Sequence, residues 1–332
     1  MTYRRINNHK TTPEMASRIA YIGQLGISFE ESECILKELT GITASKTLIR
    51  QITEEVGELI YNDEKETSEM NYIEPEKAIP YVKEKEKSDD ILYILPDGSA
   101  VNTRIVEDGT SWKEMKLGLV YSTDNIVKYN TKRTEILSRR YTACFGNVEK
   151  FKPLLFNAAI ESGYGTYKDV VMVGDGAHWI WNMCDEIFPD AVQILDFYHM
   201  SENVYNYAKY LYPNNENKKN KWAKKTIDLI ESSKSKEALR RIPAVVEKLP
   251  LGVVNLRTYI KNNINRIKYP LYKEKGYIIG SGAIESGNKK VIQHRMKQSG
   301  MRWGIKTGQA IASLRAEYAS GRWAEVTRRL AA

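Results

Sequence analysis

The sequence Val170-Val171-Met172-Val173-Gly174-Asp175-Gly176-Ala177-His178 changes character at Asp175. The apolar run before it predicts a buried strand, and the residues after Gly176 predict the start of a helix. Asp175 therefore stands where a strand ends and a helix begins. In an open α/β sheet, ligands bind beyond the carboxyl ends of the strands. A carboxylate at this place is a candidate metal ligand.

Strand and helix patterns extend on both sides of this stretch. Strands are expected at 91–95, 115–121, 140–145, 170–173 and 192–195, and helices at 148–162 and 177–187. Three strands in succession, followed by alternating helices and strands, predict a mixed sheet flanked by helices. The expected fold class is therefore α/β.

Two further carboxylates have comparable settings. Asp97 follows the apolar run 91–96 and is expected to end a strand, and Glu285 follows a helix-start signal at Ser281. Carboxylate oxygens are the ligands that Mg²⁺ prefers, and a pair of such ions can clamp the reacting oxygens of a phosphodiester. Each acid also has an ordinary explanation, because Asp-Gly pairs form turns and a Glu can cap a helix. The three together predict a metal-dependent site.

The amino-terminal part predicts three short helices between residues 13 and 60, starting at Pro13, at Ser28 and at Thr43 or Ser45. The string 36–50, with Gly41 at its break, resembles a helix-turn-helix, whose second helix contacts DNA. A structural three-helix unit explains the apolar pattern equally well. The residues expected to contact DNA here are Ser45, Lys46 and Arg50.

Positive charge is concentrated in one segment. The chain has 50 Lys and Arg and 42 Asp and Glu, a net charge of +8. Residues 205–275 hold 17 Lys and Arg against 6 Asp and Glu, a local net of +11. Such a surface attracts nucleic acid, although a solvated helical face is the alternative. Trp222 in this segment is interpreted as a core residue, with base stacking as the alternative.

The sequence lacks several competing signatures. No apolar run approaches the roughly 20 residues that span a bilayer, and the first residues show no apolar signal core. A soluble, cytoplasmic and nucleoid-associated protein without a membrane partner is expected. The three cysteines are scattered, so neither disulfides nor a zinc site are predicted. Phosphate-binding loops and nucleophile elbows are also missing.

Five sequence blocks, in order, resemble prokaryotic insertion-sequence transposases of the DDE class, in particular the Kra-type group related to the Lre-type. They are 97–99 with 112–118, 174–181, 195–199, 280–286 and 295–303. The resemblance covers about residues 13 to 323. Members of this group usually extend further at the amino terminus, so recognition of element ends is expected to be impaired if this is a shortened copy.

This resemblance implies a ribonuclease-H-like fold in which Asp97, Asp175 and Glu285 are catalytic and hold two Mg²⁺ or Mn²⁺ ions. Asp196 and His199 resemble an accessory D-x-x-H motif, with a helix-capping Asp and a packed His as the alternative. Lys289 is expected to hold a phosphate, or else to pair with Glu285. Further expected DNA contacts are Arg295, Arg302 and Trp303, of which Trp303 is also interpreted as a packing residue.

The expected organisation has five parts. They are a helix-turn-helix-like unit at 1–62, a polar linker at 63–90, the first part of the catalytic core at 91–200, a basic all-helical insertion at 201–276, and the second part of the core at 277–332. The resemblance implies cleavage of element ends and strand transfer on double-stranded DNA, with at least two protomers. The alternatives are a nuclease of the same fold that does not join DNA, and a DNA-binding regulator derived from a transposase.

Overall fold

The computed structural model describes residues 11–107, 109–130, 133–244 and 248–331. The chain divides into two compact units. Unit 1 comprises Met1–Lys168 and Ala283–Ala332, and unit 2 comprises Asp169–Gly282. Each unit is described by itself below.

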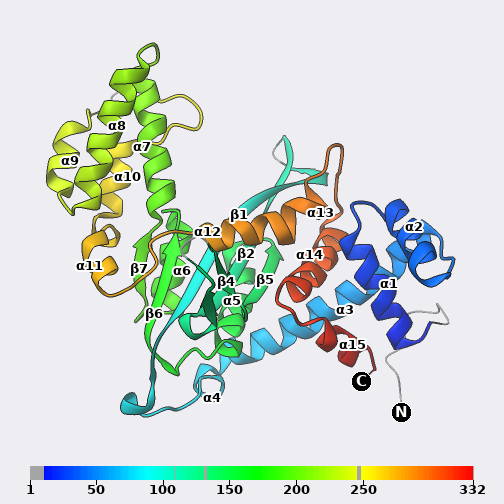
Figure 1. The fold of residues 1–332 in the computed structure, drawn as a ribbon. Coiled ribbons are helices and arrows are strands. Elements are labelled where there is room, and N and C mark those ends of the chain that lie inside the picture. The colour runs from blue at the N-terminus through cyan, green and yellow to red at the C-terminus, as the bar shows by residue number, and fades with distance from the viewer. Residues whose placement is uncertain (1–10, 108, 131–132, 245–247, 332) are drawn as a thin grey trace. The chain divides into compact units, whose positions relative to one another are not determined.

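The chain forms a mixed five-stranded sheet with the order β5-β2-β1-β6-β7. These strands are β1 (Ser88–Glu107), β2 (Thr110–Ser122), β5 (Arg140–Phe145), β6 (Tyr167–Gly174) and β7 (Val192–Leu195). β2 pairs antiparallel with β1 and with β5, whereas β6 and β7 are parallel. A separate two-stranded sheet joins β3 (Ile126–Lys128) and β4 (Thr134–Ile136). The predicted α/β class, with a mixed sheet among helices, is confirmed (Figure 1).

The expectation that Asp97 ends the first strand is wrong. β1 continues to Glu107, and Asp97 lies within it, opposite Leu117 of β2. The ladder between the two strands goes on past Gly98, which faces Lys116. Because β2 keeps supplying backbone partners, the Asp-Gly pair does not form a turn here.

In the helical part of unit 1, the first three helices begin close to the residues that the sequence predicted. Thr12, Ser28 and Ser45 cap the first three helices, and Gly41 takes a left-handed φ of 70° after the second. The helices are α1 (Pro13–Leu25), α2 (Phe29–Thr40), α3 (Lys46–Ile73), α4 (Pro75–Ala78), α5 (Val148–Glu161), α14 (Ile305–Ala319) and α15 (Trp323–Ala331). The third helix is much longer than its pattern up to residue 60 indicated.

Helices from the two ends of the chain share one core in unit 1. Figure 1 shows α1, α3, α14 and α15 side by side. Ile49, Ile52 and Val56 of α3 pack in one apolar cluster with Leu314 of α14 and Leu330 of α15. The apolar stripe of the amino-terminal helices is therefore covered by the carboxyl-terminal ones.

An ionic cluster is buried in unit 1. The Arg140 side chain is 4 % exposed and lies 3.0 Å from Glu64, 2.6 Å from Glu161 and 3.2 Å from Glu317. These residues come from β5, α3, α5 and α14, so the cluster ties four elements together. Gln309 of α14 adds two hydrogen bonds of 2.8 Å to the backbone of β5, at Ala143 O and Phe145 N.

Unit 2 contains β7, most of β6 and a series of helices. They are α6 (His178–Ile187), α7 (Phe197–Leu211), α8 (Glu216–Glu231), α9 (Ser235–Arg241), α10 (Leu256–Asn262) and α11 (Tyr269–Glu274). Trp222 of α8 is buried, with its ring 6.0 Å from that of Tyr207 in α7. The interpretation of Trp222 as a core residue is confirmed.

Candidate functional site

Asp97 in unit 1 is held by a residue that the sequence analysis missed. The Asn288 side chain donates from Nδ2 to Asp97 Oδ2. The backbone N–H of Gly98 donates to Asp97 Oδ1 at 2.7 Å. Asn288 is buried, and its Oδ1 accepts no hydrogen bond among the described residues. A buried oxygen without a donor, beside a carboxylate, is unusual and can accept a cation or water.

Glu285 lies on the same helix as Asn288. This helix, α12 (Gly282–Asn288), continues through a π-helical turn, η4 (Lys289–Gln293), into α13 (His294–Met296). Residues three apart on a helix share a face, so Glu285 lies one turn before the amide that touches Asp97. The fold thus brings the helix of Glu285 to Asp97, although 191 positions separate Asn288 from Asp97. Glu285 and Lys289 are exposed. A π-helical turn is rare and often lies at a functional site.

A cation also lies close to Asp97. Burial lowers the pKa of Lys297, and the negative charge of Asp97 acts in the opposite direction. Lys297 follows α13, at the far end of the helical stretch that starts at α12. Glu114 lies on the neighbouring strand, and a Cβ at Gly98 would be 2.2 Å from its Oε1.

Asp175 in unit 2 lies directly after β6, as predicted. Its Oδ1 accepts from Ala177 N at 2.8 Å, and its main-chain oxygen accepts from the Tyr259 hydroxyl at 2.8 Å. Gly176 has a φ of 99°, and a Cβ there would be 2.7 Å from the Tyr259 ring. Asp175 and Gly176 therefore form a turn, as the ordinary explanation of an Asp-Gly pair predicts. This turn places the half-buried carboxylate of Asp175 at the end of the strand.

Asp196 lies after β7, next to Asp175 in register. Gly174 and Leu195 face each other in the parallel pair, so the two aspartates that follow them lie at the same end of neighbouring strands. Burial raises the pKa of Tyr259, and the charges of Asp175 and Asp196 raise it further. The Tyr259 hydroxyl bonds the main chain of Asp175, and Asp196 follows the neighbouring strand.

Asp196 is also the cap of a helix. It is 1 % exposed, accepts from Tyr198 N at 2.9 Å and accepts from the Ser281 hydroxyl. The capping explanation of Asp196 is thus seen in the structure. His199 is half-buried in the first turn of α7. Both residues of the D-x-x-H pair lie at the carboxyl end of β7, which leaves an accessory role compatible with their position.

The residues present fit a divalent cation by their chemistry. The carboxylate oxygens of Asp97 and Glu285 and the amide oxygen of Asn288, which has no hydrogen-bond partner among the described residues, all come from unit 1. All are the hard oxygen donors that Mg²⁺ takes. In the described ranges, no three His, Cys, Asp or Glu side chains are grouped so as to hold a metal ion.

Several expected DNA contacts line one cavity in unit 1. This cavity of about 560 Å³ is lined by Arg50, Arg295, Arg302 and Trp303, together with Arg104. Burial raises the pKa of Glu54, which also lines it, while Arg50 and Arg104 act in the opposite direction. Arg50 and Arg302 are exposed, so the cavity presents cations to solvent.

Arg295 and Trp303 are buried parts of this cavity wall. Arg295 is 2 % exposed, donates to Ile27 O at 3.0 Å and lies between the rings of Phe29 and Trp303, at 4.8 and 5.1 Å. Burial lowers its pKa to about 10. Trp303 is 6 % exposed and donates from Nε1 to Met296 O at 3.1 Å. Packing thus takes up the side chains of both residues, and their contact with DNA stays a prediction.

The remaining expected contacts lie at the start of α3. Ser45 accepts from Leu48 N at 3.3 Å as the cap of this helix. The backbone N–H of Lys46 donates to Glu33 of α2 at 2.9 Å, and its Nζ lies 3.7 Å from Glu30. Arg50 lies 3.5 Å from Glu54. The side chains of Lys46 and Arg50 stay largely exposed.

The strand order and the carboxylates at strand ends define a mixed α/β protein with a candidate oxygen-donor site. The sequence matches no family model and no curated protein sequence. Among solved structures, the chain is similar to the Drosophila P element transposase strand transfer complex, with 12% identity and a TM-score of 0.33. The alignment covers 98% of this chain and 84% of that chain. A likeness at this level does not establish the chemistry. In the described part of the chain, no helix has the length and apolar character needed to cross a membrane.

Proposed function

We propose that this chain is a DDE transposase that cuts DNA at the ends of an insertion sequence and joins them to target DNA. One observation carries the proposal: the Asn288 amide bonds the Asp97 carboxylate, one turn away from Glu285. One hydrogen bond thus joins Asp97 to the helix that carries Glu285, although the two acids are remote in sequence. The similarity of the five sequence blocks to DDE transposases gives the reaction class.

In this proposal, Asp97, Asp175 and Glu285 hold the metal ions. Bound Mg²⁺ or Mn²⁺ would lower the pKa of an attacking water or hydroxyl and stabilise the charge on the leaving oxygen. Asn288 orients Asp97 by donating to one of its oxygens, and Gly98 N–H holds the other. Asp196 and His199, at the end of β7, support Asp175 from the neighbouring strand.

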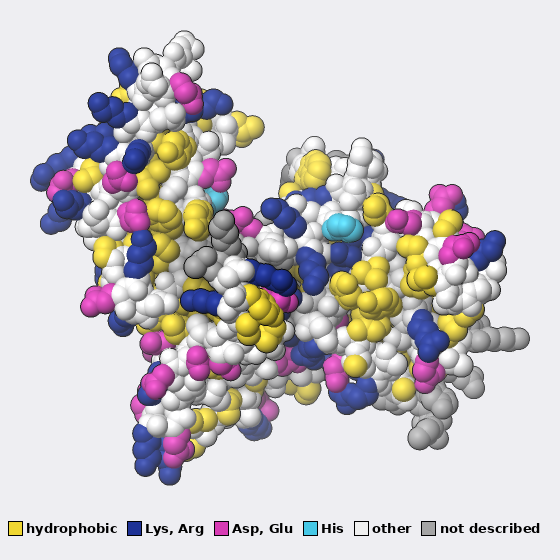
Figure 2. Space-filling model, viewed as in Figure 1, with side chains coloured by type: hydrophobic (Ala, Val, Ile, Leu, Met, Phe, Trp, Pro, Cys, Tyr) yellow, Lys and Arg dark blue, Asp and Glu magenta, His cyan; other side chains and the backbone are white. Residues whose placement is uncertain are grey.

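DNA binding is proposed for two cationic surfaces. One is the cavity of unit 1 that Arg50 and Arg302 line, with Lys46 and the capping Ser45 at the start of α3 and Lys289 on η4 as further contacts. The other is the helical part of unit 2, where Figure 2 shows Lys and Arg side chains gathered over α8 and α9. Neutralising phosphates releases counterions, which provides much of the affinity of such surfaces. A homodimer or larger assembly on DNA belongs to the same proposal.

The test is a joining assay with the purified full chain. Linear DNA that carries the sequences flanking the gene is mixed with Mg²⁺ and a supercoiled plasmid. The wild type is expected to give joined products, and Asp97→Asn, Asp175→Asn and Glu285→Gln are expected to bind DNA normally without joining it. Lys77→Ala, which removes an exposed charge on α4 outside the proposed site and the proposed DNA surfaces, is the control.

Each alternative function predicts a different result. Nicking without joined product would favour a nuclease. DNA binding by the wild type with no cleavage at all, unchanged by Asp175→Asn, would favour a regulator and would overturn the transposase proposal.

A further inference from the structure

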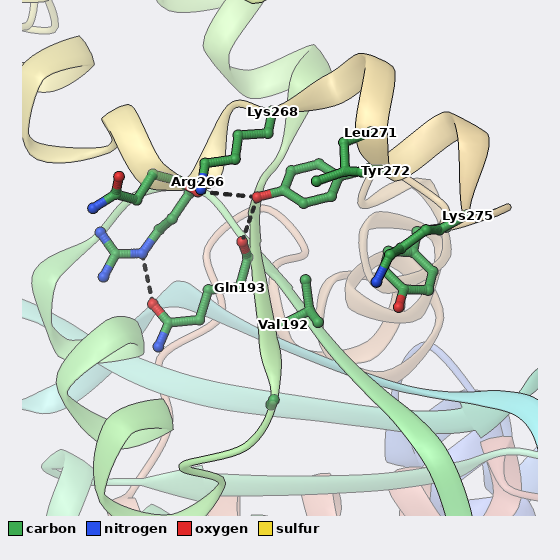
Figure 3. Close-up of a pocket in the computed structure, with 10 residues that line it drawn as sticks. Val192, Gln193, Arg266, Lys268, Leu271, Tyr272 and Lys275 are labelled. Atoms are coloured by element: carbon green, nitrogen blue, oxygen red, sulfur yellow. Dashed lines mark hydrogen bonds between the residues drawn. The ribbon is translucent and has the colours of Figure 1, made fainter.

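Unit 2 contains a cavity of about 480 Å³ that the proposed chemistry does not use. It lies beside β7 and the segment that leads into α11 (Figure 3). Three cations line it, namely Arg266, Lys268 and Lys275, and no acidic side chain from the described residues does. A cavity of this size falls within the range of about 300 to 1,000 Å³ that small ligands and ligand groups occupy.

Arg266 is fixed in place at this cavity. Its Nε donates to Gln193 Oε1 at 2.6 Å, and its Nη1 donates to Asn262 O at 3.1 Å. The guanidinium also lies 4.6 Å over the ring of Trp181. Burial lowers its pKa, and the charge of Asp185 acts in the opposite direction. A fixed, partly desolvated guanidinium is suited to hold a phosphate.

The floor of the cavity is built by aromatic and apolar groups. Tyr272 donates to Asn265 O at 3.0 Å, and its hydroxyl lies 3.4 Å from Gln193 O of the edge strand β7. Its ring stacks on Tyr277 at 6.4 Å, and Lys275 lies 5.6 Å over the Tyr277 ring. These hydrogen bonds of the Tyr272 hydroxyl fix its ring in the cavity wall and connect α11 to β7.

Lys268 and Lys275 differ from the lysine between them. Both are exposed at the rim and form no ion pair among the described residues, whereas Lys273 lies 2.6 Å from Glu231. Two unpaired ammonium groups beside a fixed guanidinium attract an anion. Val192 and Leu271 add apolar surface next to these cations.

We propose that this cavity binds one phosphate of a DNA strand, held by Arg266, Lys268 and Lys275, with the attached sugar against Val192 and Leu271. The inference rests on the proposed function, because it assigns a specific backbone contact to the helical part of unit 2. It places this contact at the edge of β7 rather than on the outer faces of α8 and α9.

The test compares DNA affinity and its salt dependence in the full chain. Fluorescence anisotropy with a labelled DNA duplex is measured for Lys268→Ala, Lys275→Ala and their double variant. The matched control is Lys65→Ala combined with Lys77→Ala, which removes two charges from exposed positions of unit 1 outside the proposed DNA surfaces. Each phosphate contact contributes about 0.9 to the slope of log affinity against log salt, so loss of the one phosphate held in the cavity is expected to lower the slope by about 0.9 in the double variant and not at all in the control.

Every result decides the matter. If the wild type binds DNA and the cavity variants match the control, the cavity inference fails while the proposed function stands. If the wild type binds no DNA, both fail together. A calorimetric titration with inorganic phosphate at constant ionic strength is expected to show no saturable binding. Saturable binding that Lys268→Ala abolishes, with DNA affinity unchanged, would identify a free-phosphate site and overturn the inference.

Discussion

Asn288 donates a hydrogen bond to Asp97 across 191 positions of sequence, and its amide oxygen, Oδ1, is buried with no donor in the described part of the chain. The amide thus orients the carboxylate and leaves a hard oxygen beside it. An amide that fixes a metal-ligating carboxylate usually contributes about 10- to 100-fold to metal affinity.

Replacing Asn288 by Ala is therefore expected to weaken Mn²⁺ binding at least about 10-fold, because Asp97 loses the group that orients it. Calorimetric titration with Mn²⁺ measures this. Ser286→Ala, an exposed change on the same helix, is the control and should leave the affinity unchanged. Equal Mn²⁺ affinity in Asn288→Ala and the wild type would remove Asn288 from the proposed site.

Replacing Arg140 by Met is expected to destabilise the protein by about 3 to 5 kcal/mol, because Glu64 and Glu317 are then left buried without their cation. Urea unfolding measures the change. The control is Arg328→Met, which removes an exposed pair with Glu325 and should change the free energy of unfolding by less than about 1 kcal/mol. Similar effects of the two variants would contradict this account of the cluster.

The same cluster predicts a pH dependence through Glu161. Burial alone would raise the pKa of Glu161, but Arg140 and Arg322 lower it below its usual value of 4.5. A lowered pKa in the folded state stabilises the fold above pH 4.5, and this contribution is lost as the pH falls further. Glu161→Gln is expected to lower the free energy of unfolding at pH 7 and to flatten its decline below pH 4.5. A stability difference from the wild type that stays the same from pH 7 to pH 3 would show that Glu161 does not titrate in this way.

Glu64 contributes to the pH dependence of stability with the opposite sign to Glu161. Burial raises the pKa of Glu64, although Arg140 acts against this. A raised pKa of an acid means that the folded state keeps the proton longer, so this residue costs stability as the pH rises above 4.5. The Glu161→Gln experiment isolates the other contribution because it leaves Glu64 in place.

Replacing Gly176 by Ala is expected to destabilise unit 2 and to displace Asp175. The new Cβ would combine a φ of 99° with a contact of 2.7 Å to Tyr259. Gly252→Ala is a matched control, since Gly252 has a φ of 82° and no described residue lies within 4 Å of an added Cβ. The control isolates the backbone strain of about 1 to 2 kcal/mol. Thermal unfolding of both variants should show the larger loss of stability for Gly176→Ala. Equal losses of stability would mean that the Tyr259 ring moves away from the new Cβ at no cost.

Removing the exposed arginines of the unit 1 cavity is expected to weaken DNA binding. Arg50→Ala and Arg302→Ala should each reduce the salt slope by about 1, because each takes away one phosphate contact. Arg18→Ala, an exposed change on α1, is the control. Anisotropy titrations at several salt concentrations measure the slopes. A slope for Arg302→Ala that equals the control would remove Arg302 from the DNA surface.

Local patterns predicted most of the sheet. The expected strand at 140–145 is β5, the one at 192–195 is β7, and Asp175 follows β6 as expected. These elements are short, and their apolar runs are bounded by glycine or polar residues, so local side-chain chemistry is enough to define them. The helix caps at Ser28 and Ser45 could also be predicted, because a capping hydroxyl accepts a hydrogen bond from a backbone N–H only three residues later.

Local sequence patterns did not predict the interactions between distant segments. β1 continues past Asp97 because β2 pairs with it, and α3 continues to Ile73, beyond its expected end. Arg295 resembled a surface cation, but the packing of Phe29 and Trp303 encloses it. Asn288 had no sequence signal beyond its place one turn after Glu285.

Hydrophobic periodicity and turn chemistry act over a few residues, so the amino-acid sequence was enough to predict the α/β class, the strand before Asp175, and Asp97, Asp175 and Glu285 as candidate ligands. Folding of the whole chain brings Asn288 to Asp97, surrounds Arg140 with Glu64, Glu161 and Glu317, and lines a cavity beside β7 with cations. Such contacts join side chains tens to hundreds of positions apart, so they depend on how the elements pack and not on any local pattern.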